Sequence, residues 1–252
     1  MKSMLAEFIA TATFFGSLSL VAQETEHHAH WAYDGKDGPK KWATLDPAYS
    51  ECKQGHHQSP IDIRHTEKAD LPPIQFDYAP SPLNIVDNGH TVMVTYESGS
   101  FLTVGDHRYQ LTQFHFHHPS EEHINGKIFD MEVHLVHSDA SGNLAVVAVV
   151  MKAGKVNPAL QTVWNHLPKE KDKEATVEGV FVTAADLLPV KRGYYTYSGS
   201  LTTPPCTEGV TWFVMKTPEE ISRGEVEVFA KLHPHDVRPA QKVEGRVIRE
   251  SK

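Results

Sequence analysis

Two runs near the middle of the chain alternate polar and apolar residues with a period of two, which predicts β-strands. The first run is Gln113-Phe114-His115-Phe116-His117, and about one hairpin later comes Glu132-Val133-His134-Leu135-Val136-His137. In the first strand, the alternation predicts a shared face for Tyr109, Leu111, Gln113, His115 and His117. In the second strand, it predicts a shared face for Glu132, His134 and Val136. Several histidines are therefore expected to gather on one side of a sheet.

Other runs rich in β-branched and aromatic residues predict further strands. They cover residues 74–78, 91–96, 101–104, 109–117, 128–137 and 210–215. Residues 144–151 are continuously apolar, as expected of a central strand that is buried on both faces.

Two helices are predicted from their start signals. Asn157-Pro158 supplies a cap and a first-turn proline, and the inward stripe of that helix is expected to comprise Leu160, Val163, Trp164 and Leu167. Ser222-Arg223-Gly224-Glu225 is a capping box, and it opens a helix expected to bury Phe229 and Leu232. Strands outnumber helices, which predicts an α+β, mainly β fold. We expect a single domain with a large central twisted, mostly antiparallel mixed sheet and short surface helices.

The composition changes this picture little. The chain has 252 residues and no compositional break that would divide it, so one domain is expected. The net charge of −8 argues against nucleic acid or an anionic membrane as the main partner.

The first 22 residues have the pattern of a secretory signal peptide. Lys2 provides a basic start, residues 8–21 are largely apolar, and Ala22 can precede the cleavage point. A polar stretch follows at once, which favours a signal over a short buried helix. We therefore expect residues 23–252 to form the exported domain, periplasmic or secreted. No later window approaches the roughly 20 apolar residues needed to span a bilayer.

The chain has two cysteines, Cys52 and Cys206. Export favours a disulfide between them, and two unpaired buried thiols are the alternative.

The histidine face is the candidate chemical site. Two imidazoles at i and i+2 lie about 7 Å apart along a strand, and a third can approach from a neighbouring strand. His115, His117 and His134 fit this arrangement. Three neutral nitrogen ligands without a fourth protein ligand describe a catalytic zinc site. Histidine pairs are weak evidence in a chain with 17 histidines, but Gln113 and Glu132 stand beside them and can orient their second nitrogens.

A redox-active iron site of the cupin type is an alternative for a His-x-His strand, and it would need a further carboxylate or histidine ligand.

Several short motifs, taken together, are more specific evidence than the histidine strands alone. They are residues 58–63, 88–90, 113–117, 120–123, 132–137, 197–206, 210–212 and 238–241, including Ser200-Leu201-Thr202-Thr203-Pro204-Pro205. With these motifs the chain resembles the alpha-class carbonic anhydrases, in particular their exported bacterial branch. The resemblance implies zinc-dependent, reversible hydration of CO2 to bicarbonate and a proton. It also implies that Cys52 and Cys206 pair to hold the active-site loop, and that a homodimer is possible.

The resemblance also implies roles for single residues. His115, His117 and His134 would hold Zn²⁺ with an open position for water. Thr202 would accept a hydrogen bond from the zinc hydroxide and donate its own proton to Glu122, while its backbone N–H meets the bicarbonate oxygens. The substrate pocket would be formed by Val136, Val146, Leu201, Thr203, Val210 and Trp212.

Proton export is implied to run through His90 as a shuttle, along a water path lined by Tyr33, Asn88 and Thr203. An imidazole titrates in the right pH range for this role. Met93 departs from the family pattern, which often has a polar residue there. His123 and His137 match internal hydrogen-bonding positions. The alternative function is a non-catalytic zinc-binding module of the same fold, and the presence of all three ligands with Thr202, Glu122 and His90 favours catalysis.

Overall fold

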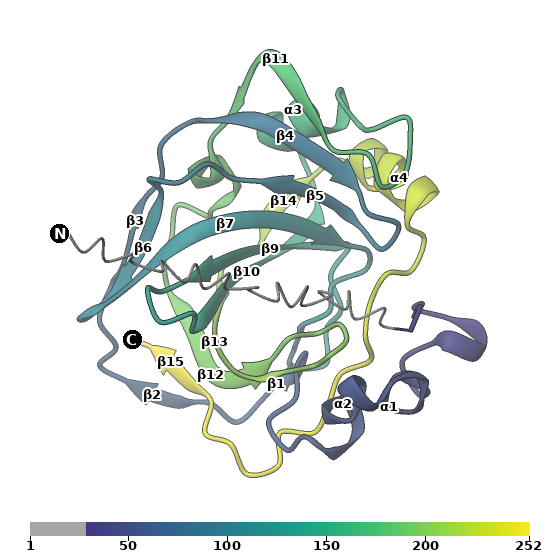
Figure 1. Ribbon diagram of the computed structural model, residues 1–252. Helices are drawn as coiled ribbons and strands as arrows, with labels where there is room; N and C mark the ends of the chain where they lie inside the picture. Colours follow the sequence, from purple (N-terminus) through teal and green to yellow (C-terminus); the bar gives the residue numbers. More distant parts are fainter. Residues whose placement is uncertain (1–28) are drawn as a thin grey trace, which may run out of the picture.

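The structure is a computed structural model and describes residues 29–252. One twisted sheet of 13 strands runs through the molecule (Figure 1). Along its main path the strands follow the order β11 (Ala175–Val182), β4 (Ser81–Asp87), β5 (Val92–Thr95), β7 (His107–His117), β9 (Met131–Ser138), β10 (Leu144–Ala153), β13 (Glu208–Met215), β12 (Tyr194–Ser200), β15 (Arg249–Ser251) and β2 (Glu67–Ala69).

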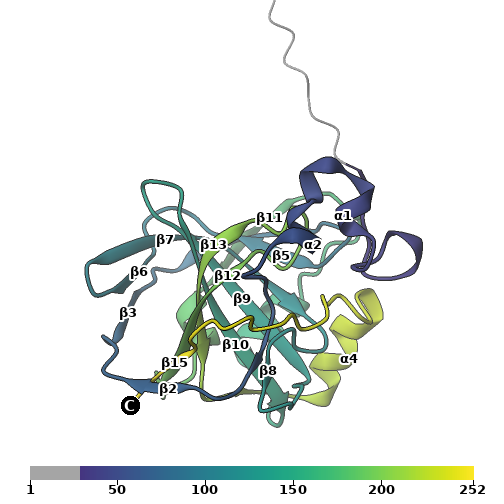
Figure 2. The ribbon, with the colours of Figure 1, turned by 90° about the horizontal axis from the view of Figure 1, so that it is seen from below.

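Three further strands join this sheet off the main path: β3 (Ile74–Asp77), β6 (Phe101–Val104) and β14 (Glu219–Ile221). A separate two-stranded sheet pairs β1 (Asp62–Ile63) with β8 (His123–Ile124). In the large sheet β10 is parallel to β13 and β14, β15 is parallel to β2, and the other pairs are antiparallel. Figure 2 shows β2 and β15 together at one edge of the molecule. The predicted mixed, mostly antiparallel sheet is confirmed.

The helices are short and lie around the sheet (Figures 1 and 2). They are α1 (Trp42–Leu45), α2 (Glu51–Gln54), α3 (Pro158–Trp164) and α4 (Arg223–Leu232), with 3-10 turns η1 (Gly35–Asp37), η2 (Pro47–Tyr49) and η3 (Ala184–Leu187). Both predicted helix starts are confirmed: the Asn157 side chain accepts from two N–H groups of the first turn of α3, and Ser222 and Glu225 form the capping box of α4. None of the helices within residues 29–252 is long and apolar enough to cross a membrane.

The two faces of the sheet bury two hydrophobic clusters, and alternate residues of the central strands enter each. In β10, Ala145, Val147 and Val149 pack into the larger cluster, whereas Val146 and Ala148 pack into the smaller one. This confirms the prediction of a central strand buried on both faces. The smaller cluster lies on the face that carries the histidines, because Val146 pairs with Val136 and Ala148 with His134 of β9.

The predicted face of β7 is wrong in its first half. The pairing of β7 with β9 shifts register between Leu111 and Gln113, so one extra residue interrupts the ladder there. The bulge reverses the alternation, and Tyr109 and Leu111 pack into the larger cluster with Phe114. Gln113, His115 and His117 keep the predicted face.

The helix predictions need two smaller corrections. Phe229 is fully buried, but Leu232 is 42% exposed because α4 ends at this residue, beside solvent. Leu167 lies beyond the end of α3 and is only partly buried against the larger cluster. The sequence pattern does not predict β4, which begins with Ser-Pro, β11, which is mostly exposed at the sheet edge, or β12. It also does not predict the short strands β1, β2, β8, β14 and β15, which have two or three residues each.

Candidate metal centre

Three imidazoles converge on the face of β7 and β9. His115 lies directly opposite His134 in the antiparallel pairing, and His117 follows His115 on the same face. The centroids of the three rings are 4.6 to 5.3 Å apart, and one nitrogen of each lies within 4.8 Å of the others. Sheet register therefore assembles the three predicted ligands from two strands.

Hydrogen bonds determine which nitrogen of each ring is available to bind a metal ion. His115 Nδ1 lies 2.8 Å from Gln113 Oε1, and His117 Nδ1 lies 2.8 Å from the carbonyl oxygen of Asp236. A carbonyl only accepts, so His117 Nδ1 carries the proton and its Nε2 keeps a lone pair. His117 Nε2 is buried and has no hydrogen-bond partner within residues 29–252.

The third ring is turned the other way. His134 Nε2 faces Glu132 Oε1 at 3.5 Å, which leaves Nδ1 of His134 for the centre of the group. Gln113 and Glu132 thus stand where the sequence placed them, each beside the outer nitrogen of a ligand. The donor set is two Nε2 atoms and one Nδ1 atom, all neutral, and it fits a zinc ion.

The environment keeps the three rings neutral. Burial lowers the pKa of His115 and His134 well below the ordinary range, and neighbouring imidazoles lower it further. Burial raises the pKa of Glu132 to about 7, while N–H donors of Glu122 and Glu121 and the nearby His117 lower it. Neutral imidazoles offer lone pairs, so protons do not compete for the site near neutral pH.

The carboxyl group beside Thr202 is Glu121, which corrects the prediction that Thr202 donates to Glu122. Both oxygens of Glu122 are already engaged, one with the Tyr197 hydroxyl at 2.5 Å and the other with the Ile61 N–H at 3.1 Å. Burial raises the pKa of Glu121 to about 8. The backbone N–H of Arg238 and the side chain of Thr202 act in the opposite direction and lower this pKa, so Thr202 interacts with Glu121 and not with Glu122.

The Thr202–Glu121 contact is looser than an ideal hydrogen bond. Glu121 Oε2 has no partner at full hydrogen-bonding geometry among the described residues, and it lies 3.5 Å from Nε2 of His117. The other oxygen accepts from the Arg238 N–H at 2.7 Å, which holds the carboxyl in place. Adjacent glutamates lie in an irregular segment between strands, so strand alternation gave no signal to separate Glu121 from Glu122.

His90 lies at a turn after β4, half-buried beside the N-terminal segment. Its ring stacks on Trp31 with centroids 3.7 Å apart and planes 7° apart, and Tyr33 lies edge-on at 6.4 Å. The Asn88 side-chain oxygen accepts from the N–H groups of His90 and Thr91, so Asn88 shapes the turn. Burial, followed by the positive field of His30, lowers the pKa of His90. No residue pattern predicts the stack of His90 on Trp31.

The smaller hydrophobic cluster reaches the histidines. It contains Val146, Val210 and Trp212, with Val136 and Leu201 partly buried against it. The Trp212 ring lies edge-on to His134 at 5.0 Å. Met93 lies directly opposite His115 in the pairing of β5 with β7, so an apolar thioether borders the third side of the site.

Comparisons with known proteins agree with this geometry. A family model described as eukaryotic-type carbonic anhydrase matches residues 37–252. A carbonic anhydrase of Nostoc sp. is 40% identical over 229 residues, covering 88% of this chain and 86% of the relative. One of Neisseria gonorrhoeae is 42% identical over 224 residues and covers 88% of each. A solved structure, a hyperthermostable carbonic anhydrase identified from a hydrothermal vent chimney, has a TM-score of 0.86 and 46% identity, covering 88% of this chain and 100% of that one.

This chain belongs to the alpha-class carbonic anhydrase family. The family's function is the hydration of CO2, and the group of three histidines fits its zinc site.

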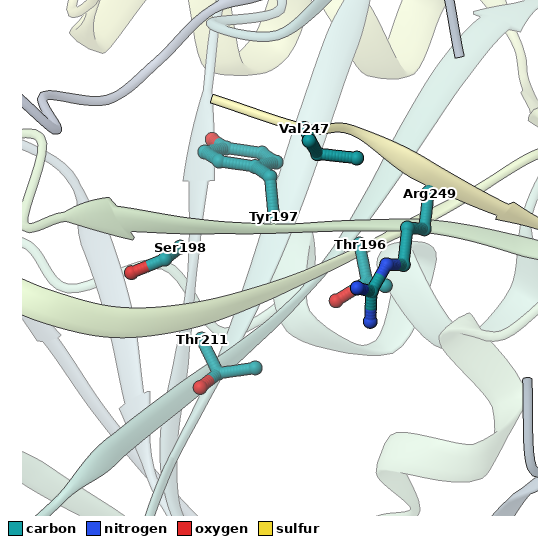
Figure 3. A pocket seen from close by; sticks show the side chains of 6 residues that line it. All are labelled: Thr196, Tyr197, Ser198, Thr211, Val247 and Arg249. Carbon is teal, nitrogen blue, oxygen red and sulfur yellow. The ribbon is translucent and has the colours of Figure 1, made fainter. Parts of the chain in front are cut away.

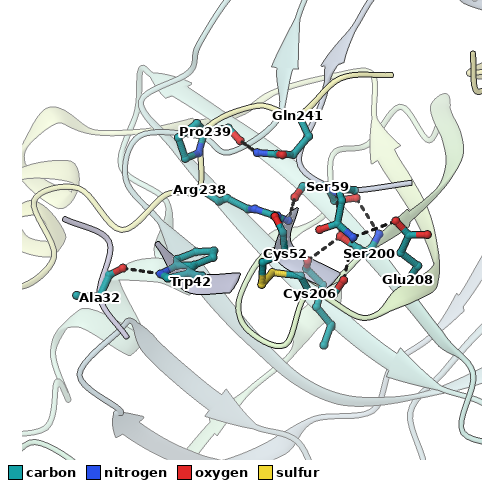
Figure 4. The surroundings of a disulfide bond; sticks show 12 residues. Ala32, Trp42, Cys52, Ser59, Ser200, Cys206, Glu208, Arg238, Pro239 and Gln241 are labelled. Carbon is teal, nitrogen blue, oxygen red and sulfur yellow. Dashed lines mark hydrogen bonds between the residues drawn. A yellow bond between two sulfur atoms is a disulfide. The ribbon is translucent and has the colours of Figure 1, made fainter. Parts of the chain in front are cut away.

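The predicted disulfide of this carbonic anhydrase is confirmed. Cys52 in α2 is bonded to Cys206, in the loop that carries Thr202 (Figure 4). The Arg238 guanidinium donates to the carbonyl oxygens of Cys52 and Ser59, at 3.0 and 2.8 Å. The bridge and Arg238 together tie the active-site loop to two distant segments of the chain.

A cavity lined by other residues lies apart from the three histidines. This cavity of about 230 Å³ is lined by Thr196, Tyr197, Ser198, Thr211, Val247 and Arg249 (Figure 3). None of these six residues is a predicted zinc ligand or a substrate-pocket residue. The Tyr197 hydroxyl is engaged by Glu122 and Ser59, so it is not free to act on a molecule in this cavity.

Proposed function

We propose that this chain catalyses the reversible hydration of CO2 with zinc held by His115, His117 and His134. The observation that carries the proposal is the buried, unpartnered Nε2 of His117 beside two further neutral imidazoles whose outer nitrogens are engaged. A buried polar atom without a partner is costly unless a ligand satisfies it. When bound, zinc supplies a Lewis acid that lowers the pKa of a coordinated water toward neutrality, for which carbonic anhydrase is the standard example.

Thr202 and Glu121 orient the nucleophile in this proposal. With the Thr202 hydroxyl donating to Glu121, the lone pairs of the threonine oxygen are left for the reacting water, so Thr202 accepts a hydrogen bond from that water and fixes its direction. Glu121 in turn is held by the Arg238 N–H at 2.7 Å. Glu121 is buried, so bulk water does not compete with Thr202 for its oxygen.

CO2 would wait against the smaller hydrophobic cluster. Val136, Val146, Leu201, Val210 and Trp212 offer an apolar surface next to His134, which suits an uncharged molecule without hydrogen-bond donors. Thr203, which follows Thr202 in the same loop, borders this pocket in the proposal.

His90 would carry the released proton to the solvent. Its half-buried ring opens onto a cavity that Tyr33 also lines, and Asn88 holds its turn. Replacing His90 with Ala should lower turnover in dilute buffer, and added imidazole should restore it. Unchanged turnover of this variant in dilute buffer would remove His90 from the mechanism.

The decisive test is stopped-flow CO2 hydration on protein assayed for zinc, before chelation, after chelation and after zinc is restored. The proposal expects about one zinc per chain, with activity lost and regained alongside it. Bound zinc without activity would support a non-catalytic zinc-binding module of the same fold. Redox-active iron in place of zinc would support the oxygenase alternative.

Export and assembly are further proposals. The signal peptide over residues 1–22 lies outside the described residues, and the Cys52–Cys206 disulfide supports an oxidising compartment for residues 23–252. N-terminal sequencing of protein from the periplasm or medium tests the cleavage after Ala22. Sedimentation analysis tests the proposed homodimer.

A further inference from the structure

A cavity of about 280 Å³ lies beside His90. Its lining includes the N-terminal segment around Trp31 and Tyr33 and residues 232–236, at and after the end of α4. His90 and His233 both line this space, and His233 is among the groups that lower the pKa of His90, after burial, His30 and Lys171. The cavity is large enough to hold several waters between two imidazoles.

His233 is a buried imidazole that the proposed reaction does not yet use. Its side chain is 7% exposed, and its Nε2 lies 3.3 Å from Asp87 Oδ1. Nε2 has no hydrogen bond at full geometry within residues 29–252. The residue also caps the C-terminal end of α4, where the helix dipole favours a positive charge.

Asp87 joins His233 to the turn that carries His90. The same Oδ1 atom that faces His233 accepts from the Gly89 N–H at 2.9 Å, one residue before His90. Burial lowers the pKa of His233 and Asp87 raises it, while Lys171, which lines the same cavity, and His117 lower it. Asp87 is thus the carboxylate next to His233 that can stabilise the positive charge of a protonated His233.

We propose that His233, paired with Asp87, is a second proton carrier in series behind His90. This inference rests on the proposed CO2 hydration. The His90 imidazolium gives one proton through cavity water to the neutral His233 imidazole and becomes neutral again. His233 becomes an imidazolium beside the Asp87 carboxylate, and a buffer base then removes the proton. One proton moves at each step, and both imidazoles return to their starting state.

The test uses the zinc-loaded full-length enzyme and its His233→Gln variant. Glutamine keeps an N–H donor toward Asp87 but cannot carry a proton at neutral pH. We expect kcat in dilute buffer to fall about fivefold, less than the ~10²-fold typical of a sole acid–base group. The ratio kcat/KM, which reports the CO2 step, should stay unchanged, and imidazole should restore kcat. His235→Gln removes another imidazole from the same cavity and serves as the matched control, with no expected loss.

Two results would overturn the relay. Wild-type kcat for His233→Gln in dilute buffer would mean that His233 only holds Asp87 and the turn. In a series relay, His233→Gln should cause no further loss of kcat in a protein that already carries His90→Ala. Additive losses of kcat in the double variant would therefore exclude the relay. Absence of CO2 hydration in the zinc-loaded wild-type enzyme would instead overturn the proposed function itself, and the same assay separates the two failures.

Discussion

The Nε2 atom of His134 lies 3.5 Å from Oε1 of Glu132, and both atoms are buried without another partner within residues 29–252. The second oxygen of Glu132 accepts hydrogen bonds from the backbone N–H groups of Glu121 and Glu122, at 2.8 and 2.9 Å. One buried carboxyl therefore contacts a metal ligand and fixes the segment that carries Glu121. A buried carboxylate is costly without such partners, so this pair couples zinc binding to the shape of the site.

Replacing Glu132 with Gln should weaken zinc binding about 10- to 100-fold, the usual effect of removing a group that orients a ligand. The amide keeps the size of the side chain but removes the negative charge that faces the protonated Nε2 of His134. Zinc transfer to a chelating dye measures the dissociation rate without any need for activity. Glu97→Gln, at an exposed position, is the matched control. Equal zinc release from both variants would show that Glu132 does not support His134.

Glu121 and Glu122 should respond differently to the same substitution. In Glu121→Gln the Arg238 N–H needs the single amide oxygen, so an NH2 group instead of an acceptor faces the Thr202 hydroxyl. We expect kcat/KM to fall about 10²-fold through misorientation of the nucleophile. In Glu122→Gln the amide oxygen can still accept from the Ile61 N–H, and the NH2 group can donate to the Tyr197 hydroxyl oxygen, so kcat/KM should change little. Zinc content and thermal unfolding of both variants separate orientation from loss of the fold. A larger loss of kcat/KM in Glu122→Gln would restore the original assignment.

The zinc ligands could be predicted from the sequence because regular strand geometry carries them. His115, His117 and His134 lie within paired stretches of β7 and β9 where alternation holds, and the same alternation placed Gln113 and Glu132 on their face. The continuous apolar run of β10 predicted its central place for a similar reason. Where backbone geometry is periodic, a pattern of side chains is enough to assign a face.

The remaining features depend on contacts that periodicity does not encode. The bulge before Gln113 moved Tyr109 and Leu111 to the opposite face, and no residue type in that run marks it. Glu121 and Glu122 lie between strands, where only the completed fold decides which carboxyl meets Thr202. His233 is separated by more than a hundred residues from Asp87, so their approach follows from the packing of α4 beside the turn after β4. Long-range packing, not local propensity, determines these relationships.

Removing the disulfide should destabilise the fold and loosen the active-site loop. The bridge joins residues 154 positions apart, for which the chain-entropy estimate is about 5 kcal/mol as an upper figure. We expect the Cys52→Ala/Cys206→Ala double variant to lose about 2–5 kcal/mol of unfolding free energy in urea. Its kcat/KM should also fall, since Thr202 lies in the loop that the bridge holds. Wild-type protein unfolded under reducing conditions should match the double variant, and equal stability with and without the bridge would contradict the prediction.

His137 is a neutral core histidine on the strand that carries His134. Its Nδ1 faces the Ala145 carbonyl oxygen at 3.3 Å and its Nε2 faces the Tyr78 hydroxyl at 2.7 Å, so Nδ1–H donates and Nε2 accepts. Burial lowers the pKa of His137 from 6.5 to about 4. Between these two values the unfolded chain binds a proton that the folded chain does not. The free energy of unfolding is therefore unaffected by the titration of His137 above pH 6.5, and it decreases as the pH falls from 6.5 toward 4.

The size of this loss can be isolated with His137→Gln, which keeps a polar side chain but does not titrate. The lowered pKa corresponds to about 3 kcal/mol of unfolding free energy, so the variant should lose less stability than the wild type between pH 7 and pH 4, by about that amount. Urea unfolding at both pH values, on zinc-free protein, measures the difference. Zinc-free protein is used because acid also releases the metal, which would add a second pH-dependent loss. His107→Gln changes an exposed histidine and should leave the pH dependence as it is in the wild type. Parallel losses in His137→Gln and the wild type would show that His137 is not the buried titrating group responsible.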